Sequence, residues 1–373
     1  LASKANHTTG ANLTAVGHNA AGSNTSANNT TAIGQNALLL NTTGGENTAV
    51  GSTCLDANTT ASNNTGVGFA ALGTNTTGTQ NAALGAFALF ANTTANNNTS
   101  LGYNSLAQNT TGGENTAVGG FALDANSTGA NNTAVGVNAL GANTTASNNT
   151  AMGLSALLFN TTGANNVAVG AFALFANTTA SNNTAVGHNA LKSNTTASNN
   201  SAFGYHALED NTTGTQNNAF GRGVLEENTT GSNHVAVGNN ALNTNTTGDN
   251  NNAVGVNALT ANTTGTNNLA VGVNTLDANT TGTDNVAVGN SALGSMVSGT
   301  FNVAVGVGSL GSATGFRMTA VGHRTGENTT SATDNTIVGY ASQLVTTGSS
   351  NSSLGSFSLV NNTTGHDNTA VGR

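Results

Sequence analysis

Residues 47–63 read Asn-Thr-Ala-Val-Gly-Ser-Thr-Cys-Leu-Asp-Ala-Asn-Thr-Thr-Ala-Ser-Asn, and the rest of the chain repeats this pattern with few changes. Each copy holds an Asn-Thr-Ala-Val-Gly block, an Ala-Leu pair and an Asn-Thr-Thr block that ends in Gly or Ala. Glycine closes the first block in all 22 copies. A tandem array of this kind predicts short coils that stack on their neighbours, because no single copy can bury its own apolar face.

The apolar residues of each copy lie in two short pieces, represented by Val50 and Leu55, between Gly and Asn residues. This rhythm is typical of strands and turns, whereas a helix would be destabilised by the Gly, Asn and Thr in every copy. We therefore predict an all-β fold, a parallel β-solenoid (β-roll or β-helix) of about 22 coils with a 17-residue repeat. Residues 1–373 would form one solenoid domain with no separate cap, stalk or anchor. Coils stacked about 4.8 Å apart would make a rod of about 105 Å.

The glycine after the first apolar residue is expected at a corner, where the backbone needs a positive φ or a close approach. These corner glycines include Gly17, Gly34, Gly51, Gly119, Gly136, Gly187, Gly238 and Gly372. A second corner is expected at the Thr-Thr-Gly or Thr-Thr-Ala block. Ala replaces Gly there at Ala61 and Ala146, so this corner should be less demanding.

Asparagine recurs at two fixed positions of the repeat, which predicts two ladders of side-chain amides hydrogen-bonded from coil to coil. One ladder begins at Asn47 and continues through Asn64. The asparagines of the other also begin Asn-x-Thr or Asn-x-Ser sequons, which are candidate glycosylation sites in a secreted chain. This sequon ladder comprises Asn41, Asn58, Asn75, Asn92, Asn109, Asn143, Asn160, Asn177, Asn194, Asn211, Asn228, Asn245, Asn262 and Asn279.

Two cross-sections of the coil fit this pattern. In one, small residues fill a thin interior, so one of the two apolar columns lies on an outer face and favours association. In the other, a three-sided coil takes both apolar columns inside and forms a self-sufficient monomeric rod. The repeat alone is compatible with both cross-sections.

The composition excludes several classes of protein. Charged residues make up 5% of the chain, the net charge is −8, and the six Lys and Arg residues are scattered, so a nucleic-acid surface is not expected. No apolar stretch reaches the roughly 18 residues that a membrane-spanning helix needs. Cys54 is the only cysteine and occupies a position that is otherwise mostly Ala or Ser, which indicates a small core residue.

No catalytic, cofactor-binding or metal-binding constellation is expected, so we predict a protein that is not an enzyme. The acidic pairs Glu209-Asp210 and Glu226-Glu227 would stack as a solvated patch. Asp56, Asp124 and Asp277 share one position of the repeat but lie several coils apart. Five of the seven histidines are candidate ligands but show no metal-ligand spacing: His18, His188, His206, His234 and His323.

Blocks such as Asn132-Thr-Ala-Val-Gly-Val-Asn-Ala-Leu140 and Asn183-Thr-Ala-Val-Gly-His-Asn-Ala-Leu191 resemble the Asn-Thr-Ala-Val-Gly repeats of bacterial surface and phage-tail-fibre-like proteins. Those repeats are related to the head repeats of trimeric autotransporter adhesins. The resemblance covers the whole chain. It implies parallel β-rolls, three chains side by side and binding to host or matrix surfaces. The adhesin repeat is typically shorter than seventeen residues.

From these observations we expect an extracellular or cell-surface structural fibre, a self-assembling filament subunit with an Asn- and Thr-rich surface. The near-whole number of coils suggests end-to-end stacking, and an outer apolar column suggests a lateral trimer. An alternative is an adhesin head or tail-fibre shaft that recognises host, matrix or glycan. A Thr column such as Thr42, Thr59 and Thr76 raises ice binding as a minor alternative. The expected partner is the chain itself, with no cofactor.

Overall fold

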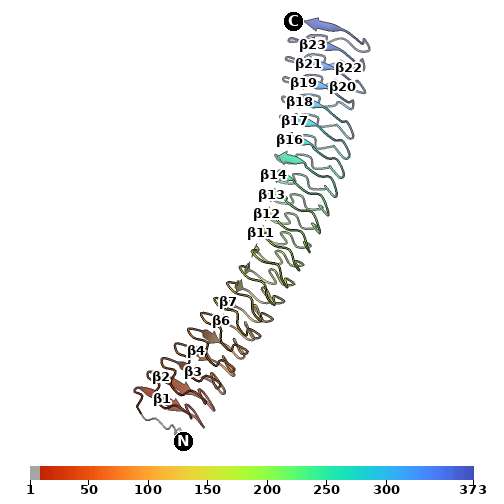
Figure 1. Cartoon of the computed structure of the whole chain (residues 1–373). Helices are drawn as coiled ribbons and strands as arrows, with labels where there is room; N and C mark the ends of the chain where they lie inside the picture. Colours follow the sequence, from red (N-terminus) through yellow and green to blue (C-terminus); the bar gives the residue numbers. More distant parts are fainter. Residues whose placement is uncertain (1–8) are drawn as a thin grey trace. The chain divides into compact units, whose positions relative to one another are not determined.

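The computed structural model describes residues 9–373, and these residues form a parallel β-solenoid with a 17-residue repeat, as the sequence predicts (Figure 1). The 22 corner glycines from Gly17 to Gly372 bound about 21 turns. No helix occurs in residues 9–373. The chain divides into two compact units, the first ending at Asn183 and the second beginning at Thr184.

Every turn contributes one short strand to a parallel ladder. In the first unit the strands are β1 (Leu13–Val16), β2 (Thr30–Ile33), β3 (Thr48–Val50), β4 (Thr65–Val67), β5 (Ala82–Leu84), β6 (Thr99–Leu101), β7 (Thr116–Val118), β8 (Thr133–Val135), β9 (Thr150–Met152) and β10 (Val167–Val169). In the second unit they are β11 (Thr184–Val186), β12 (Ser201–Phe203), β13 (Asn218–Phe220), β14 (Val235–Val237), β15 (Asn252–Val254), β16 (Leu269–Val271), β17 (Val286–Val288), β18 (Val303–Val305), β19 (Thr319–Val321), β20 (Asn328–Thr329), β21 (Thr336–Val338), β22 (Val345–Thr346), β23 (Ser352–Leu354) and β24 (Thr369–Val371).

Within each unit, each strand pairs with the strand of the next coil at the same position of the repeat. Val50 pairs with Val67 on the next strand, seventeen residues later. Two coils of the second unit are one residue shorter, because Val303 pairs with Thr319 and Thr336 pairs with Ser352. In the same region β20 and β22 pair as a separate two-stranded sheet. The repeat length thus sets the strand register throughout both units.

The two apolar columns of the repeat differ in direction: the Leu55 column points into the coil and the Val50 column points out of it. Leu55 and Ala49 are fully buried, whereas Val50, the last residue of β3, points outward and is half-buried. The same division holds along both units: the Leu column fills the interior, and the residue before each corner glycine faces out. Burying one Leu per coil contributes about 1.5–3 kcal/mol each time. The first of the two cross-sections, with one apolar column outside, is therefore the observed one.

In most coils, three positions have left-handed backbone conformations without being glycine. In the coil that begins at Asn47 these residues are Thr53, Leu55 and Asn63, with φ between 51° and 62°. Asn tolerates this conformation, but for a bulky residue such as Leu it costs about 1–2 kcal/mol. Burial of the Leu side chain offsets that cost. The left-handed Leu lets the chain reverse within a very short coil.

The corner glycines have φ between 122° and 141°, and before the last one, Gly372, they lie against the backbone of the next coil, as Gly51 and Gly136 do. A Cβ atom on Gly136 would lie 2.4 Å from the carbonyl oxygen of Gly153, so no side chain fits there. At the second corner the structure differs from our expectation. Ala61 at the Thr-Thr-Ala block does not have a left-handed φ, and Asn63 two residues later has it instead. Ala at that block therefore carries no strain from a left-handed φ.

Replacing Gly136 with Ala should therefore lower the free energy of unfolding by roughly 1–3 kcal/mol, because the corner needs an unusual φ and close backbone contact. Gly141→Ala is a matched control in the same coil. Gly141 has no left-handed φ, and its added Cβ would meet mainly the flexible end of Leu158 at 3.0 Å. Chemical denaturation of both variants checks the difference. Equal losses of unfolding free energy in the two variants would mean that Gly136 is not at a strained corner.

Candidate functional site

The predicted amide column lies inside the solenoid and runs along each unit. In the first unit, Nδ2 of Asn58 donates to Oδ1 of Asn41 at 2.8 Å and to the carbonyl of Ala61 at 3.0 Å. The same pair of hydrogen bonds recurs up to Asn177, and in the second unit from Asn211 to Asn279. Every one of these side chains is fully buried. The column therefore satisfies buried polar groups from coil to coil.

This burial disfavours these asparagines as glycosylation sites in the folded chain. A glycan would have to be attached to Nδ2, and in Asn58 that atom is buried and already donates two hydrogen bonds. The same holds for the other positions of the column described above. The folded coil leaves no room for a sugar, so glycosylation of this column is not proposed.

The second asparagine column, which includes Asn47 and Asn64, is also buried but uses its amides differently. Oδ1 of Asn47 accepts the backbone N–H of Asn64 at 2.9 Å, and Nδ2 of Asn47 donates to the carbonyl of Ala61 at 2.7 Å. Each amide thus fixes the start of the next strand and closes its own coil. The two columns together explain the two fixed asparagine positions of the repeat.

His234 replaces an asparagine of the second column. Its Nδ1 accepts the backbone N–H of Asn251 at 3.1 Å, the role that Oδ1 has in the other coils. The ring is fully buried, and burial lowers the pKa of His234 to about 4. The imidazole is therefore neutral at physiological pH and serves as a structural acceptor. The sequence pattern offered a signal for this role, since His234 stands at an asparagine position.

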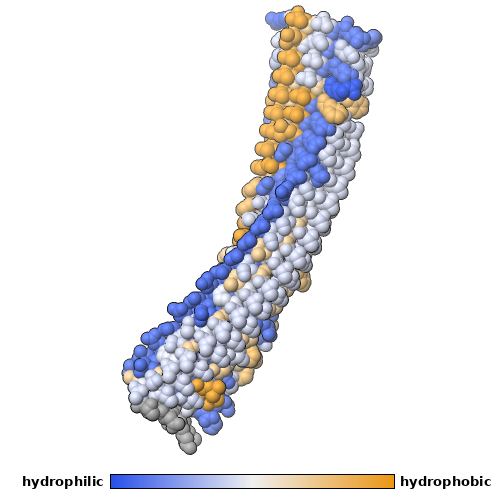
Figure 2. Space-filling model, viewed as in Figure 1, coloured by the Kyte–Doolittle hydropathy of each residue, from blue (hydrophilic) through white to orange (hydrophobic). Residues whose placement is uncertain are grey.

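The outward-facing residues of the strand ladder form an apolar face that is widest in the second unit. The first and third residues of each strand point outward, and in β16, β17 and β18 all six are Leu or Val. Val254 in β15 is 40% exposed. In Figure 2 an orange band runs along the side where Figure 1 labels β16 to β23. We call the outward residues of β11–β19, β21, β23 and β24 the outer strand face.

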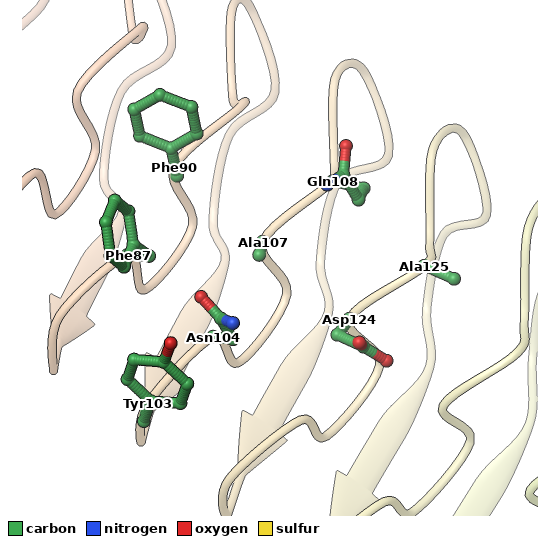
Figure 3. A pocket seen from close by; sticks show the side chains of 8 residues that line it. All are labelled: Phe87, Phe90, Tyr103, Asn104, Ala107, Gln108, Asp124 and Ala125. Carbon is green, nitrogen blue, oxygen red and sulfur yellow. The ribbon is translucent and has the colours of Figure 1, made fainter.

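A row of aromatic rings lines a groove on the turns of the first unit (Figure 3). The ring centroids of Phe69 and Phe87 are 5.2 Å apart, and those of Phe87 and Phe90 are 5.9 Å apart, both edge to face. Tyr103 and Phe121 continue the row at 5.4 Å. The groove has a volume of about 380 Å³ and opens to solvent. The pair of Phe87 and Phe90 is thus part of a larger aromatic surface.

Polar side chains face the rings across this groove. Asn104, Gln108 and Asp124 lie on the two coils that follow Phe90, as Figure 3 shows. Partial burial raises the pKa of the Asp124 carboxyl. On the other side of Phe87 and Phe90, Asp56 lines a second groove of about 450 Å³. The two Asp residues, expected to be isolated, both border the aromatic row.

The structure brings together a histidine and two glutamates that the sequence analysis had kept apart. Nδ1 of His206 lies 2.7 Å from Oε2 of Glu209 and 3.1 Å from Oε1 of Glu226. All three side chains are partly buried. The expected acidic patch is therefore a mixed cluster, because the His206 ring faces Glu209 of its own coil and Glu226 of the next coil.

Cys54 is part of the buried core. Cys54 is fully buried, and burial raises the pKa of its thiol to about 12, so the expectation of a small core residue is confirmed. Its Sγ fits because Gly66 stands where most coils have Ala.

The Thr column that begins at Thr42 bonds to the backbone: the Thr42 hydroxyl donates to the carbonyl of Thr59 at 3.0 Å. The hydroxyls of this column donate to the backbone of the next coil, an arrangement that does not favour ice binding there.

The sequence matches no protein-family model and no curated protein. Among the described residues, no helix is long and apolar enough to cross a membrane. The corner glycines and asparagine columns serve the fold. The outer strand face, the aromatic groove and the His206 cluster remain as surfaces that can engage other molecules.

The buried His234 predicts a pH-dependent stability. Unfolded histidine has a pKa near 6.5, and the folded ring has a pKa of about 4. The unfolded chain therefore binds more protons in this interval, so stability is complete above pH 6.5 and is lost as the pH falls toward 4. The loss is roughly 1.4 kcal/mol per pH unit at most.

His234→Asn restores the usual column residue and should remove this component. Urea denaturation of both proteins at pH 7 and pH 5 checks it. The difference in unfolding free energy between wild type and His234→Asn should shift with pH. The same difference at pH 7 and pH 5 would contradict the assignment of His234 as a buried neutral imidazole.

Proposed function

We propose that this chain is a structural fibre element of an extracellular or cell-surface assembly, in which the outer strand face of one copy packs against that of another. The observation that carries the proposal is the apolar column that faces outward on the strand ladder. Large exposed apolar surfaces of soluble proteins are typically interaction sites. The resemblance of the Asn-Thr-Ala-Val-Gly blocks to surface and tail-fibre repeats supports the extracellular placement.

The size of the outer strand face fits a stable interface. Twelve strands of the second unit belong to the ladder, and each presents two outward residues, which gives twenty-four positions. A standard protein interface takes about 20–30 residues from each partner. No charged residue occupies an outward position between β14 and β19. Packing this face against a partner therefore leaves no charge unpaired.

A second copy of the chain is the partner that matches this face best. It carries the same apolar column with the same coil spacing, so side chains can interlock at every coil. A compact globular partner would cover only a few coils. Neighbouring copies associated in this way, and extended by coil-to-coil pairing, would build the fibre.

The proposal is tested by placing charge on the face. Val237→Lys combined with Val254→Lys should weaken self-association at least tenfold, because desolvating an unpaired ammonium is costly. Thr247→Lys combined with Thr264→Lys adds the same charge to the same coils, at exposed positions outside the strands. Sedimentation velocity over a concentration series measures the change. Electron micrographs distinguish lateral bundles from end-to-end filaments.

Two outcomes would refute side-by-side association. The wild-type protein could remain monomeric at the highest soluble concentration. Alternatively, the Thr→Lys control could weaken association as much as the Val→Lys variant, which would mean that general charge rather than the face is responsible.

The aromatic groove supports a second candidate function, adhesion through a carbohydrate. Exposed rings next to amide and carboxylate groups suit a ligand with apolar C–H faces and many hydroxyls. Asp56 and Asp124 lie four coils apart, or about 19 Å at the strand spacing. That length fits an oligosaccharide better than a single sugar.

Binding of a panel of soluble oligosaccharides, measured by calorimetry, tests this second candidate. Phe90→Ala should abolish the binding that the wild type shows, because it removes one of the two rings, Phe87 and Phe90, that line both grooves. Phe159→Ala is the control, since Phe159 is similarly exposed on the same unit but does not line either groove. Absence of binding by the wild type, or equal loss in the control, would reject an adhesive groove.

A further inference from the structure

The cluster of His206, Glu209 and Glu226 has the composition of a metal site. His206 and Glu209 lie three residues apart on the turn that follows β12, and Glu226 lies on the equivalent turn after β13. One ligand atom from each residue lies within 4.8 Å of the other two. Two neighbouring coils of the second unit thus direct one nitrogen and two carboxylate oxygens at a common point.

Amide groups hold the two carboxylates in this orientation. Nδ2 of Asn189 donates to Oε1 of Glu209 at 3.0 Å, and Nδ2 of Asn243 donates to Oε2 of Glu226 at 3.0 Å. In both glutamates the other oxygen faces the imidazole. Outer-shell hydrogen bonds of this kind are what metal sites use to orient their ligands.

The imidazole ring of His206 is also held in place. It stacks on the ring of Tyr205 with 3.7 Å between centroids and an angle of 14°. An open groove of about 220 Å³, lined by His206, Glu226 and Arg222 among others, reaches the cluster from solvent. The ligands are therefore preorganised, and an ion has a path of entry.

Hydrogen bonding alone satisfies this arrangement poorly. A neutral imidazole has a single N–H, so Nδ1 can donate one proton to the two carboxylates that approach it. A divalent cation at the same point would neutralise both carboxylates and accept the nitrogen lone pair. With bonds of about 2.0–2.2 Å, ligand atoms of a tetrahedral Zn²⁺ lie about 3.3–3.6 Å apart. The two distances from Nδ1 of His206, 2.7 and 3.1 Å, are somewhat shorter, so a small outward shift of the carboxylates would admit the ion.

We propose that His206, Glu209 and Glu226 bind a divalent transition-metal ion, with Zn²⁺ as the best fit, and that this ion fastens two neighbouring coils together. The nitrogen ligand favours Zn²⁺ over Mg²⁺ and Ca²⁺, which prefer oxygen ligands. Three protein ligands leave a fourth position open to solvent. Lys192 lies 3.3 Å from Oε1 of Glu209, the oxygen that faces away from the imidazole, so it opposes the ion by charge without occupying its place.

The test is calorimetric titration of the tag-free full chain with Zn²⁺, and with Mg²⁺ for comparison. We expect one saturable Zn²⁺ site, no comparable Mg²⁺ site, and slower amide exchange in residues 204–238 when Zn²⁺ is bound. His206→Asn should weaken binding at least tenfold, and Glu226→Gln likewise, because each removes a ligand. Asn already occupies the position of His206 in other coils, for example at Asn240, so the variant keeps the fold.

Lys192→Met should strengthen binding, since it removes a nearby positive charge. His18→Asn is the matched control at the surface of the first unit and should leave binding unchanged. The proposal is overturned if the wild type has no saturable Zn²⁺ site. It is also overturned if His206→Asn binds as tightly as wild type, or if Mg²⁺ binds as well as Zn²⁺.

Discussion

The structure depends on buried side-chain amides that hydrogen-bond along the solenoid axis. A coil of seventeen residues has many turns, and the backbone groups of these turns face a narrow interior that water does not reach. Unpaired groups there would each cost about 1–3 kcal/mol. The asparagine columns remove this cost. The side chain of Asn58 bonds to Asn41 and to the carbonyl of Ala61. The side chain of Asn47 bonds to the backbone N–H of Asn64 in the next coil and to the carbonyl of Ala61 in its own coil.

The other features of the coil follow from this narrow interior. Once two amides and one Leu occupy it, only small residues such as Ala49 fit beside them, and Val50 has to face outward. The corner glycines let adjacent coils approach closely enough for the amide bonds to form. The outward apolar face on which the proposed association rests is thus a consequence of how the interior is filled.

The second unit shows what happens where the first column is interrupted. Met296, Ala313, Thr329 and Thr346 replace its asparagines. Oδ1 of Asn279, the last amide before the break, has no hydrogen-bond partner, and the buried amide of Gln343 has none either. In the same coils β20 and β22 pair through their backbones, and two coils lose a residue. Backbone pairing takes over part of the role of the amides.

Much of this architecture could be predicted from the sequence, because a strict repeat determines which residues stack. The period fixed the parallel register and the stacking of residues such as Asn41 on Asn58, and the invariant glycine marked the first corner. The sequence did not predict the left-handed Leu55, since local preference opposes that conformation and only burial compensates for it. The sequence also left open whether Val50 faces inward or outward, because its direction depends on the path of the turn that contains Leu55.

The His206 cluster was missed because its members are separated by three and twenty residues, which is no recognised metal spacing in a linear chain. In a solenoid of this period, a separation of twenty equals one coil plus three residues. The clustering also requires the left-handed backbone at His206, which the sequence did not reveal. The aromatic groove was not predicted, since its rings come from different coils, for example Phe90 and Tyr103.

Hydrogen exchange of an Asn160→Leu variant tests the central claim most directly. Leu has a similar size but cannot donate to Asn143 or to the carbonyl of Gly163, as Asn160 does. If buried amides hold the coils together, amide exchange in residues 143–177 should accelerate markedly, while distant coils and a surface control, Thr162→Ala, stay as in wild type. Unchanged protection in residues 143–177 would contradict the account, because the apolar core and the strand ladder alone would then suffice.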